Sequence, residues 1–276
     1  MPRTTVAFQG ERGAFSEIAA RMMAGSSISL KPCEIFDDVF DLVERKQAKY
    51  GVIPIENSLI GSIHHNADLL LQRKLHIIAE SQVRVVHCLI APRHVTLGQV
   101  KRVFSHPAAL EQCRTFFKAH PAKEPVSYYD TAGAVKMLAG SRLTDAAAIA
   151  SPYAARLHKM KVLKASIEDE KSNFTRFYLL SRRPVVVHGP AKTSIVFSLK
   201  NKPGALFRAL SVFALRDIDL SKIESRPVRT TAWAYNFYVD FLGSIAQPHV
   251  RHALANLAEI TDFIKVLGCY PVGRRR

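Results

Sequence analysis

The apolar residues at the start of the chain are spaced so that strands alternate with helices. Residues 4–8 alternate as a strand does, residues 9–13 form a glycine-containing loop, and residues 14–23 have the apolar spacing of a helix. The elements expected next are a strand at 31–35, a helix at 38–48, a strand at 51–55, a polar turn at 56–62, a helix at 64–71 and a strand at 75–79. Such alternation is typical of an α/β sheet.

A second series of the same kind begins near residue 83. Its expected strands are 85–91, 102–105, 127–129 and 147–150, and its expected helices are 107–119, 131–138 and 153–158. Two successive α/β lobes follow from this pattern, the second at about residues 84–172. A strand at 173–180 would cross back to the first lobe, and a cleft between two lobes is a favoured place for a small ligand.

The end of the chain has a different pattern. Residues 184–192 contain two prolines and a glycine, which predict a linker. The strands expected after it are 193–199, 218–225, 234–242 and 263–270, with helices at 203–215 and 248–259. The order βαββαβ is the ferredoxin-like pattern. We therefore expect domains at residues 1–183 and 193–272.

Composition narrows the class of protein. The chain has 276 residues, of which 48% are hydrophobic and 22% charged, as in folded globular proteins. No apolar run approaches the roughly 18 residues that cross a bilayer, so we expect no membrane association. Residues 1–8 lack the features of a targeting leader, which predicts a cytoplasmic location. The four cysteines are widely spaced and contain no CxxC pair, so we expect reduced, mostly buried thiols and no metal site.

The net charge of +16 is unusual, but the basic residues are spread over the whole chain. Nucleic-acid-binding proteins usually concentrate such charge in a stripe or motif. The one basic run, residues 274–276, is expected to be a solvated tail. A diffuse positive field raises the encounter rate of small anions, so we expect an anionic metabolite as the partner rather than nucleic acid.

Eight short segments, in order along the chain, carry a resemblance to a known family. They are Gly13-Ala14-Phe15-Ser16, Pro54-Ile55-Glu56-Asn57-Ser58, Ser105-His106-Pro107, Asp130-Thr131-Ala132, Ala148-Ile149-Ala150-Ser151, Thr175-Arg176-Phe177, Asn201-Lys202-Pro203-Gly204-Ala205-Leu206-Phe207 and Glu224-Ser225-Arg226-Pro227. Each segment alone would be weak evidence for a family. Eight of them in the right order across two differently built domains are specific evidence, because an accidental match is improbable.

On these motifs the chain resembles the monofunctional prephenate dehydratase family with a C-terminal ACT domain. The resemblance implies a two-lobed, periplasmic-binding-protein-like catalytic domain, followed by a ferredoxin-like ACT regulatory domain. It also implies an enzyme of phenylalanine biosynthesis that converts prephenate to phenylpyruvate, losing carbon dioxide and the ring hydroxyl without a metal or cofactor. The sequence agrees with this in having no Walker loop, no GxGxxG and no cluster of His and Cys ligands.

The chemistry of the elimination gives roles to one motif. Hydroxide is a poor leaving group, so the site must supply a hydrogen-bond donor to it. The resemblance assigns this task to Thr175, with Arg176 as a fork for a carboxylate and Phe177 either at the substrate or packed in the core. Without the resemblance, Thr175 and Arg176 would be interpreted as a strand residue and a surface charge.

The remaining candidates have open alternatives. Glu56 is either an acid with a raised pKa or a residue that orients Asn57, which we favour. Ser16 and the segment 58–62 are either anion sites at helix starts or ordinary caps, and the family pattern favours binding. His106 either contacts the substrate or closes a turn, while Thr131 and Ser151 are either lining residues or N-caps. The expected catalytic residues are Thr175 and Glu56, and the expected substrate-binding residues are Ser16, Asn57, Ser58, Gly61, Ser62, His106, Thr131, Ser151, Asn173, Arg176 and Phe177.

By resemblance, the ACT domain pairs between subunits and binds L-phenylalanine as a feedback inhibitor. The expected binding residues are Asn201, Gly204, Ala205, Leu206, Glu224, Ser225, Arg226 and Pro227. A single ACT unit leaves a sheet edge and half of a binding site exposed, so we expect a homo-oligomer, either a dimer or a tetramer.

Two features leave the substrate open between prephenate and arogenate, which bears an amine where prephenate has a keto group. Ala108 stands where most relatives have a glutamine, and residues 62–71 resemble the branch that includes plant arogenate dehydratases. We prefer prephenate, because no plastid leader is present. A noncatalytic amino-acid sensor is the rival class, and the intact segment 175–177 argues against it.

Overall fold

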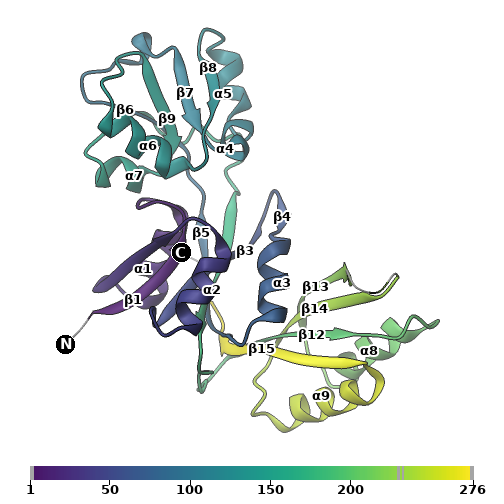
Figure 1. Ribbon diagram of the computed structural model, residues 1–276. Helices are drawn as coiled ribbons and strands as arrows, with labels where there is room; N and C mark the ends of the chain where they lie inside the picture. Colours follow the sequence, from purple (N-terminus) through teal and green to yellow (C-terminus); the bar gives the residue numbers. More distant parts are fainter. Residues whose placement is uncertain (1–2, 229–230, 232, 274–276) are drawn as a thin grey trace. The chain divides into compact units, whose positions relative to one another are not determined.

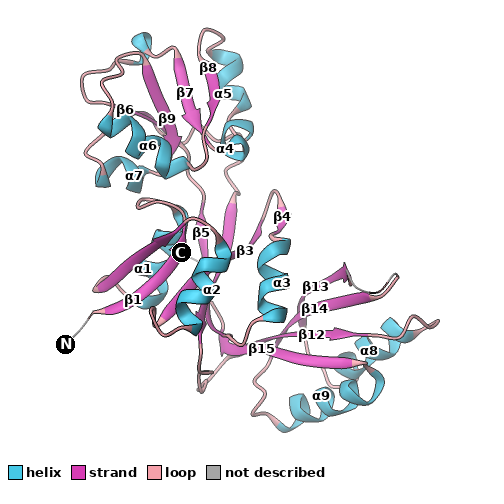
Figure 2. Ribbon diagram, in the orientation of Figure 1, coloured by secondary structure: helices cyan, strands magenta, loops and turns pink. Residues whose placement is uncertain are grey.

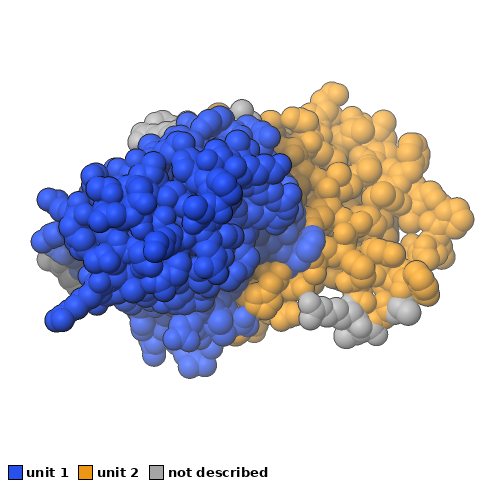
Figure 3. Space-filling view, turned by 90° about the horizontal axis from the view of Figure 1, so that it is seen from above, with its two compact units in different colours: residues 1–64, 81–177, 275–276 blue, residues 65–80, 178–274 orange. Residues whose placement is uncertain are grey.

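The computed structural model of the chain describes residues 3–228, 231 and 233–273. The basic run at 274–276, expected to be a solvated tail, lies outside the described residues. The described chain forms two compact units, shown in blue and orange in Figure 3. The first comprises residues up to 64 together with 81–177, and the second comprises 65–80 together with the chain from 178 onwards. These bounds differ from the domain division expected at residues 183 and 193, which stays a prediction.

The first sheet has six strands. They are β1 (Thr4–Gln9), β2 (Ile28–Cys33), β3 (Tyr50–Asn57), β4 (Gly61–Ser62), β5 (His76–Arg84) and β11 (Phe174–Ser181), in the order β2-β1-β3-β11-β5 with β4 paired to β3. β1 is parallel to both β2 and β3 and is buried on both faces at Val6, Ala7 and Phe8. The helices α1 (Phe15–Ala24) and α2 (Phe36–Glu44) pack against β1 and β3 (Figure 1).

The second lobe is a separate five-stranded sheet with helices (Figure 2). Its strands are β6 (Cys88–Ala91), β7 (Arg102–Ser105), β8 (Glu124–Ser127), β9 (Ala146–Ala150) and β10 (Lys161–Lys164), in the order β10-β6-β9-β7-β8. The helices are η1 (Leu97–Gln99), α4 (Pro107–Glu111), α5 (Arg114–Ala119), α6 (Thr131–Gly140) and α7 (Pro152–Leu157). β9 is almost entirely alanine and completely buried, so α6 can pack closely onto it. The predicted two-lobed α/β class is confirmed.

The helix expected at residues 107–119 is broken into α4 and α5. Asp169, far along the chain, accepts hydrogen bonds from the backbone N–H groups of Arg114 (2.9 Å) and Thr115 (3.0 Å) at the start of α5. The N–H of Asp169 donates in turn to the carbonyl of Gln112 (2.8 Å). A cap brought in by tertiary structure therefore starts a new helix where the local pattern predicted none.

The C-terminal module has the predicted ferredoxin-like order. Its elements are β12 (Ala191–Ser198), α8 (Ala205–Ala214), β13 (Leu220–Pro227), β14 (Tyr235–Leu242), α9 (Pro248–Ile260) and β15 (Phe263–Pro271), with the sheet order β13-β14-β12-β15. α8 and α9 share an apolar core with this sheet (Figure 2). β12 includes Ala191 and Lys192, which the sequence assigned to the linker.

The helix α3 (His64–Gln72) is packed in the second unit rather than in the first lobe. Tyr238 donates to the carbonyl of Ala67 (3.2 Å), and Arg226 pairs with Asp68 (3.0 Å). The strand after α3, β5, is packed against β15 in the same way. A Cβ added to Gly268 of β15 would lie 2.2 Å from the carbonyl oxygen of Ile77 on β5. Only glycine permits so close an approach of β15 to β5.

Two further expectations concern the whole chain. All four cysteines are buried, and none forms a disulfide. Over the described residues, no helix is both long and apolar enough to span a bilayer.

Candidate active site

The expected site residues converge in part on a cavity of about 370 Å³ in the first unit. Both lobes contribute side chains to it, and so does β11, which carries Thr175 and Phe177. The lining residues are Gln9, Phe15, Ser16, Phe36, Pro54, Asn57, Ile60, Ile63, Val85, His87, His106, Ala108, Ala109, Gln112, Tyr129, Asp130, Thr131, Thr175 and Phe177.

The amide of Asn57 connects the end of β3 to Thr175. Its Nδ2 lies 3.0 Å from Oγ1 of Thr175 and 2.8 Å from Oδ1 of Asn173, while its Oδ1 accepts from the backbone N–H groups of Leu59 and Ile60. Because Thr175 Oγ1 accepts from this amide, its own O–H is left to donate elsewhere. Asn57 is buried, so the hydrogen bond is held in a low-dielectric environment.

The network continues from Asn173 into the second lobe. Nδ2 of the fully buried Asn173 donates to Oε1 of Gln112 (2.9 Å), which also lies 2.9 Å from Nε2 of His87. Since Gln112 Oε1 can only accept, His87 carries its proton on Nε2. Nδ1 of His87 is buried and has no hydrogen-bond partner among the described residues. Burial lowers the pKa of His87 despite the hydrogen bond that it donates to Gln112, so its ring is neutral at pH 7.

Direct contacts hold the two lobes together beside the cavity. Ser151, the N-cap of α7, donates from Oγ to the carbonyl of Gly13 (2.9 Å) and accepts from the N–H of Ala154. Gly13 has φ +99°, and a Cβ there would lie 3.0 Å from Ala154. Ser151 is therefore used in this contact between the lobes and is absent from the cavity lining.

Four other predicted binding residues do line the cavity. Ser16 lies on α1, and Thr131 is the first residue of α6. Nδ1 of His106 accepts from the N–H of Ala108 (3.2 Å), so the ring proton is on Nε2, which can donate to an anion. Phe177 lines the cavity and is also buried in the core, so both of the positions expected for it, at the substrate and in the core, are occupied by one side chain.

The structure separates the rest of the predicted set from this cavity. Glu56 and Arg176 are absent from the lining and face each other, with Oε2 and Nη1 3.7 Å apart. Ser58 instead connects the end of β3 to the segment before β11. Its Oγ donates to the carbonyl of Ser172 and accepts from the N–H of Phe174. Gly61 and Ser62 form β4, the short strand that folds back on Glu56 and Asn57.

Several residues that line the cavity were not predicted from the sequence to belong to the site. Among them are His87, Gln112 and Asp130. Asp130 could have been found from the sequence, because it is the first residue of the segment Asp130-Thr131-Ala132. Its side chain caps α6 by accepting from the N–H of Gly133 (2.7 Å). His87 and Gln112 could not have been found in this way, because the tertiary fold alone brings them to Asn173. Among the residues that the structure describes, no three His, Cys, Asp or Glu side chains are placed to hold a metal.

The expected phenylalanine-binding residues lie in the second unit. Gly204 has φ 76° and is the N-cap of α8, which begins at Ala205 and exposes Leu206. Asn201 is exposed in the turn before it. The segment Glu224–Pro227 forms the end of β13, an edge strand.

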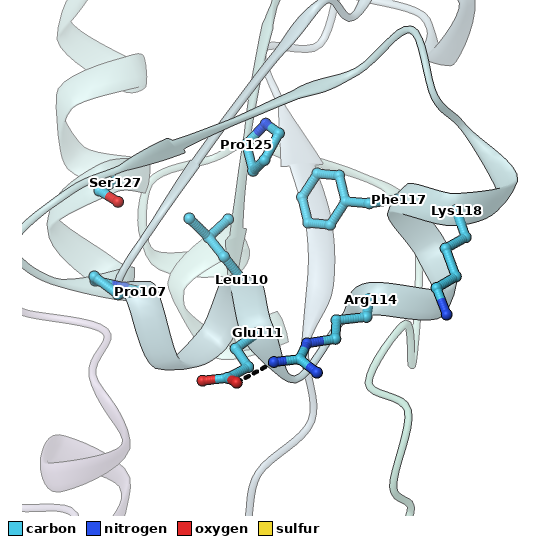
Figure 4. Close-up of a pocket in the computed structure, with 8 residues that line it drawn as sticks. All are labelled: Pro107, Leu110, Glu111, Arg114, Phe117, Lys118, Pro125 and Ser127. Atoms are coloured by element: carbon cyan, nitrogen blue, oxygen red, sulfur yellow. Dashed lines mark hydrogen bonds and ion pairs between the residues drawn. The ribbon is translucent and has the colours of Figure 1, made fainter.

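A second cavity, of about 600 Å³, lies on the second lobe and contains none of the predicted site residues (Figure 4). Leu110, Phe117 and Pro125 give it an apolar wall, and Glu111 and Arg114 form an ion pair at its edge. Ser127 is the one hydroxyl-bearing residue among those that line it, and no Asn, Gln or His side chain lines it, so it is not our candidate active site.

Comparison with known proteins gives two family matches. The family described as "Prephenate dehydratase" matches residues 6–185, and the family described as "ACT domain" matches residues 193–259. A similar relative is "Arogenate dehydratase/prephenate dehydratase 2, chloroplastic" of Arabidopsis thaliana, 47% identical over 282 residues, which cover 98% of this chain and 73% of the relative.

Two solved structures are also similar to this chain. Prephenate dehydratase from Arthrobacter aurescens in complex with L-Phe has a TM-score of 0.89 at 32% identity, covering 97% of this chain and 90% of that one. A protein described as GqqA, a novel type of quorum quenching acylase, has a TM-score of 0.87 at 33% identity, covering 97% of both chains.

The expected cytoplasmic location is wrong by this comparison, because the Arabidopsis relatives are named as chloroplastic. That expectation rested on the side chains of residues 1–8 alone.

Proposed function

We propose that this chain, which belongs to the prephenate dehydratase family, is an enzyme that converts prephenate to phenylpyruvate and is regulated by L-phenylalanine through its ACT domain. The resemblance inferred from the motifs is confirmed by the two family matches. The observation that carries the proposed mechanism is the hydrogen bond of 3.0 Å from Asn57 to the hydroxyl of Thr175 in the cavity.

The reaction breaks two bonds at opposite ends of the substrate ring. The bond from the ring to the carboxylate breaks and leaves its electron pair in the ring, which releases carbon dioxide. The bond from the ring to the hydroxyl then breaks, and the departing oxygen takes up one proton to leave as water. Prephenate and one proton thus give phenylpyruvate, carbon dioxide and water, and aromatisation of the ring drives the loss.

In this mechanism Thr175 donates a hydrogen bond to the departing oxygen. Asn57 orients the threonine by occupying a lone pair of Oγ1, so that the O–H points to the substrate. A hydroxyl that already accepts a hydrogen bond is a stronger donor, because hydrogen bonds in a chain polarise one another. The amide of Asn57 is held in turn by its hydrogen bond to Asn173, which is bonded to Gln112, which is bonded to His87.

We assign substrate binding to Ser16, His106, Thr131 and Phe177, which line the cavity with Thr175. Hydroxyl and imidazole N–H groups are donors to the carboxylates of the substrate. We assign Glu56 to the orientation of Asn57, its neighbour on β3, and Arg176 to the pairing of Glu56. Arogenate is the alternative substrate, because the same two bonds would break in it.

The first test is turnover of prephenate and of arogenate, each with and without L-phenylalanine, by the wild type and by two variants. Thr175→Ala is expected to lower kcat by about 10²–10³-fold, as for loss of a donor to a developing anion. Thr175→Ser keeps the hydroxyl and should retain most of the activity. Unchanged turnover in Thr175→Ala would refute this role. A folded wild-type protein that binds phenylalanine but turns over neither substrate would favour the sensor.

For regulation, we propose that L-phenylalanine binds between subunits of a homo-oligomer, a dimer or a tetramer. On one subunit it would contact Asn201 and the start of α8 at Gly204, Ala205 and Leu206. The segment Glu224–Pro227 of a second copy would face it. β13 is an edge strand, and an unpaired edge is a template for pairing with another chain. The L-Phe complex of the Arthrobacter relative supports the choice of effector.

A further inference from the structure

We propose that the carboxylate of Asp130 binds the ammonium group of arogenate, and that this residue therefore determines how well the site accepts arogenate relative to prephenate. The inference rests on the proposed function, because it places the substrate in the cavity that contains Thr175. It concerns specificity and not the bonds that break.

The first observation is the charge of the cavity lining. Asp130 is the one carboxylate among the lining residues, and no lysine or arginine is among them. The basic side chains nearby have acidic partners of their own. Lys136 donates to both carboxylate oxygens of Glu11 (2.9 Å each), and Arg12 pairs with Glu17 (2.9 Å). Among the described residues, no lysine or arginine forms an ion pair with Asp130.

The second observation is that the helix cap uses one oxygen of the half-buried Asp130 carboxylate. Oδ1 accepts from the N–H of Gly133 at 2.7 Å and so caps α6. Oδ2 lies beside Gly10, where an added Cβ would be only 3.1 Å away. Gly10 has φ +104°, a conformation suited to glycine, so no side chain of residue 10 covers Oδ2.

The electrostatics of Asp130 favour a cationic ligand. Burial raises its pKa, and the charge of Glu11 adds to that effect, while hydrogen bonds from Gly133 and Ala132 and the nearby imidazole of His106 oppose it. A carboxylate that is partly desolvated and lacks a basic side-chain partner gains most from an ammonium group. A keto oxygen offers the opposite interaction, because it is only an acceptor and faces an anion.

The shape of the substrate matches this placement. The ring hydroxyl and the side chain that carries the amine or keto group stand at opposite ends of the ring. Thr175 comes from β11, and Asp130 comes from the start of α6 in the second lobe, so the cavity presents them from different elements. With its hydroxyl at Thr175, arogenate would direct its side chain toward the second lobe. Thr131 adds a hydroxyl donor there for the carboxylate of the same side chain.

The test compares kcat/KM for both substrates in the wild type, Asp130→Asn, Asp130→Ser and Glu124→Gln. Asparagine and serine both cap helices well, so α6 is preserved in either variant. Glu124→Gln removes a negative charge at an exposed position of β8, outside the cavity lining, and it is the matched control. We expect both Asp130 variants to lose about 10–100-fold in kcat/KM for arogenate, mainly through KM, consistent with loss of a charge-assisted contact.

Prephenate should respond differently. Its kcat/KM should stay the same or rise in Asp130→Asn, because the amide can donate to the keto group. Glu124→Gln should leave the ratio of the two substrates unchanged. An equal loss for both substrates, or no loss for arogenate, would overturn the role of Asp130 while leaving the proposed function intact. Failure of the wild type to turn over either substrate would instead count against the proposed function.

Discussion

At the scale of single residues, Glu17 is the buried charge on which the junction of the two lobes depends. It is completely buried on α1 and pairs with Arg12 and Arg21, each at 2.9 Å. It also accepts hydrogen bonds from the N–H of Gly13 (2.9 Å) and from the hydroxyl of Tyr153 in the second lobe (2.7 Å). Burial alone raises the pKa of Glu17, but these hydrogen bonds outweigh it and hold the pKa below its usual value.

A carboxylate whose pKa is lowered by folding stabilises the protein above the pKa of the unfolded chain, roughly 4.3, and loses this effect as the pH falls through the folded value. We expect Glu17→Gln to lower the free energy of unfolding by about 2 kcal/mol at pH 7. The variant should also lose less stability than the wild type between about pH 5 and pH 3. Denaturant unfolding across this range measures both effects.

The matched control for Glu17 is Asp41→Asn. Asp41 pairs with Arg45 one helical turn away and keeps 32% of its side chain exposed, so its removal should cost much less stability than that of the fully buried Glu17. Equal effects of the two substitutions would show that burial of Glu17 does not matter.

At the scale of secondary structure, α3 depends on a side chain almost 200 positions along the chain. Nζ of Lys265 on β15 donates to the carbonyls of Leu70 (2.9 Å), Leu71 (2.8 Å) and Arg73 (2.8 Å) at the end of this helix. These carbonyls have no partner within the helix, and a cation there also complements the helix dipole.

We expect Lys265→Met, which keeps the length of the side chain, to lower the free energy of unfolding by about 2 kcal/mol through loss of charged hydrogen bonds. Hydrogen exchange should accelerate first at the amides of α3 and much less at α9. Lys161→Met, at an exposed position of β10, is the control and should change neither. Unaltered protection of α3 in Lys265→Met would argue that the helix is held by its apolar contacts alone.

At the scale of the whole molecule, the open edge at β13 governs the proposed assembly. Its residues alternate between half-buried and exposed, and Ile223 is 47% exposed on this edge strand. We expect Ile223→Asp to reduce the molar mass in solution to that of a monomer, because a charge at a strand edge opposes pairing. Phenylalanine control should be lost while turnover without phenylalanine stays within about threefold.

Leu215→Asp is the matched control for this edge. Leu215 is a more exposed apolar residue, at the C-cap of α8 and away from β13. Light scattering over a range of concentrations should find its mass equal to that of the wild type. A wild-type protein that is monomeric at all concentrations, or an Ile223→Asp variant that keeps both its mass and its control, would refute the assembly through β13.

Local sequence by itself determined the order of elements and several of their ends. The strand expected at residues 102–105 is β7. The helix expected from Thr131 begins there, but Asp130 and not Thr131 is its cap, and the helix expected from Tyr153 begins at Pro152 with Ser151 as its cap. These features follow from the spacing of apolar residues and from side chains that bond to their own backbone, so neighbours in sequence suffice. The motifs likewise determined the family, because they are short and contiguous.

Tertiary structure decided the features that join distant segments. Asp169 divides the helix expected at 107–119, and α3 is packed in the second unit by contacts such as that of Lys265. Thr175 and Phe177 line the cavity while Arg176 pairs with Glu56, because neighbouring residues of a strand face opposite sides. The position of Asp130 just before an expected helix is evident from the sequence. Only the tertiary fold places its carboxylate in the lining of the same cavity as Thr175. A residue's local bonds are set by its neighbours in sequence, whereas its chemical partners are set by which surfaces the core brings together.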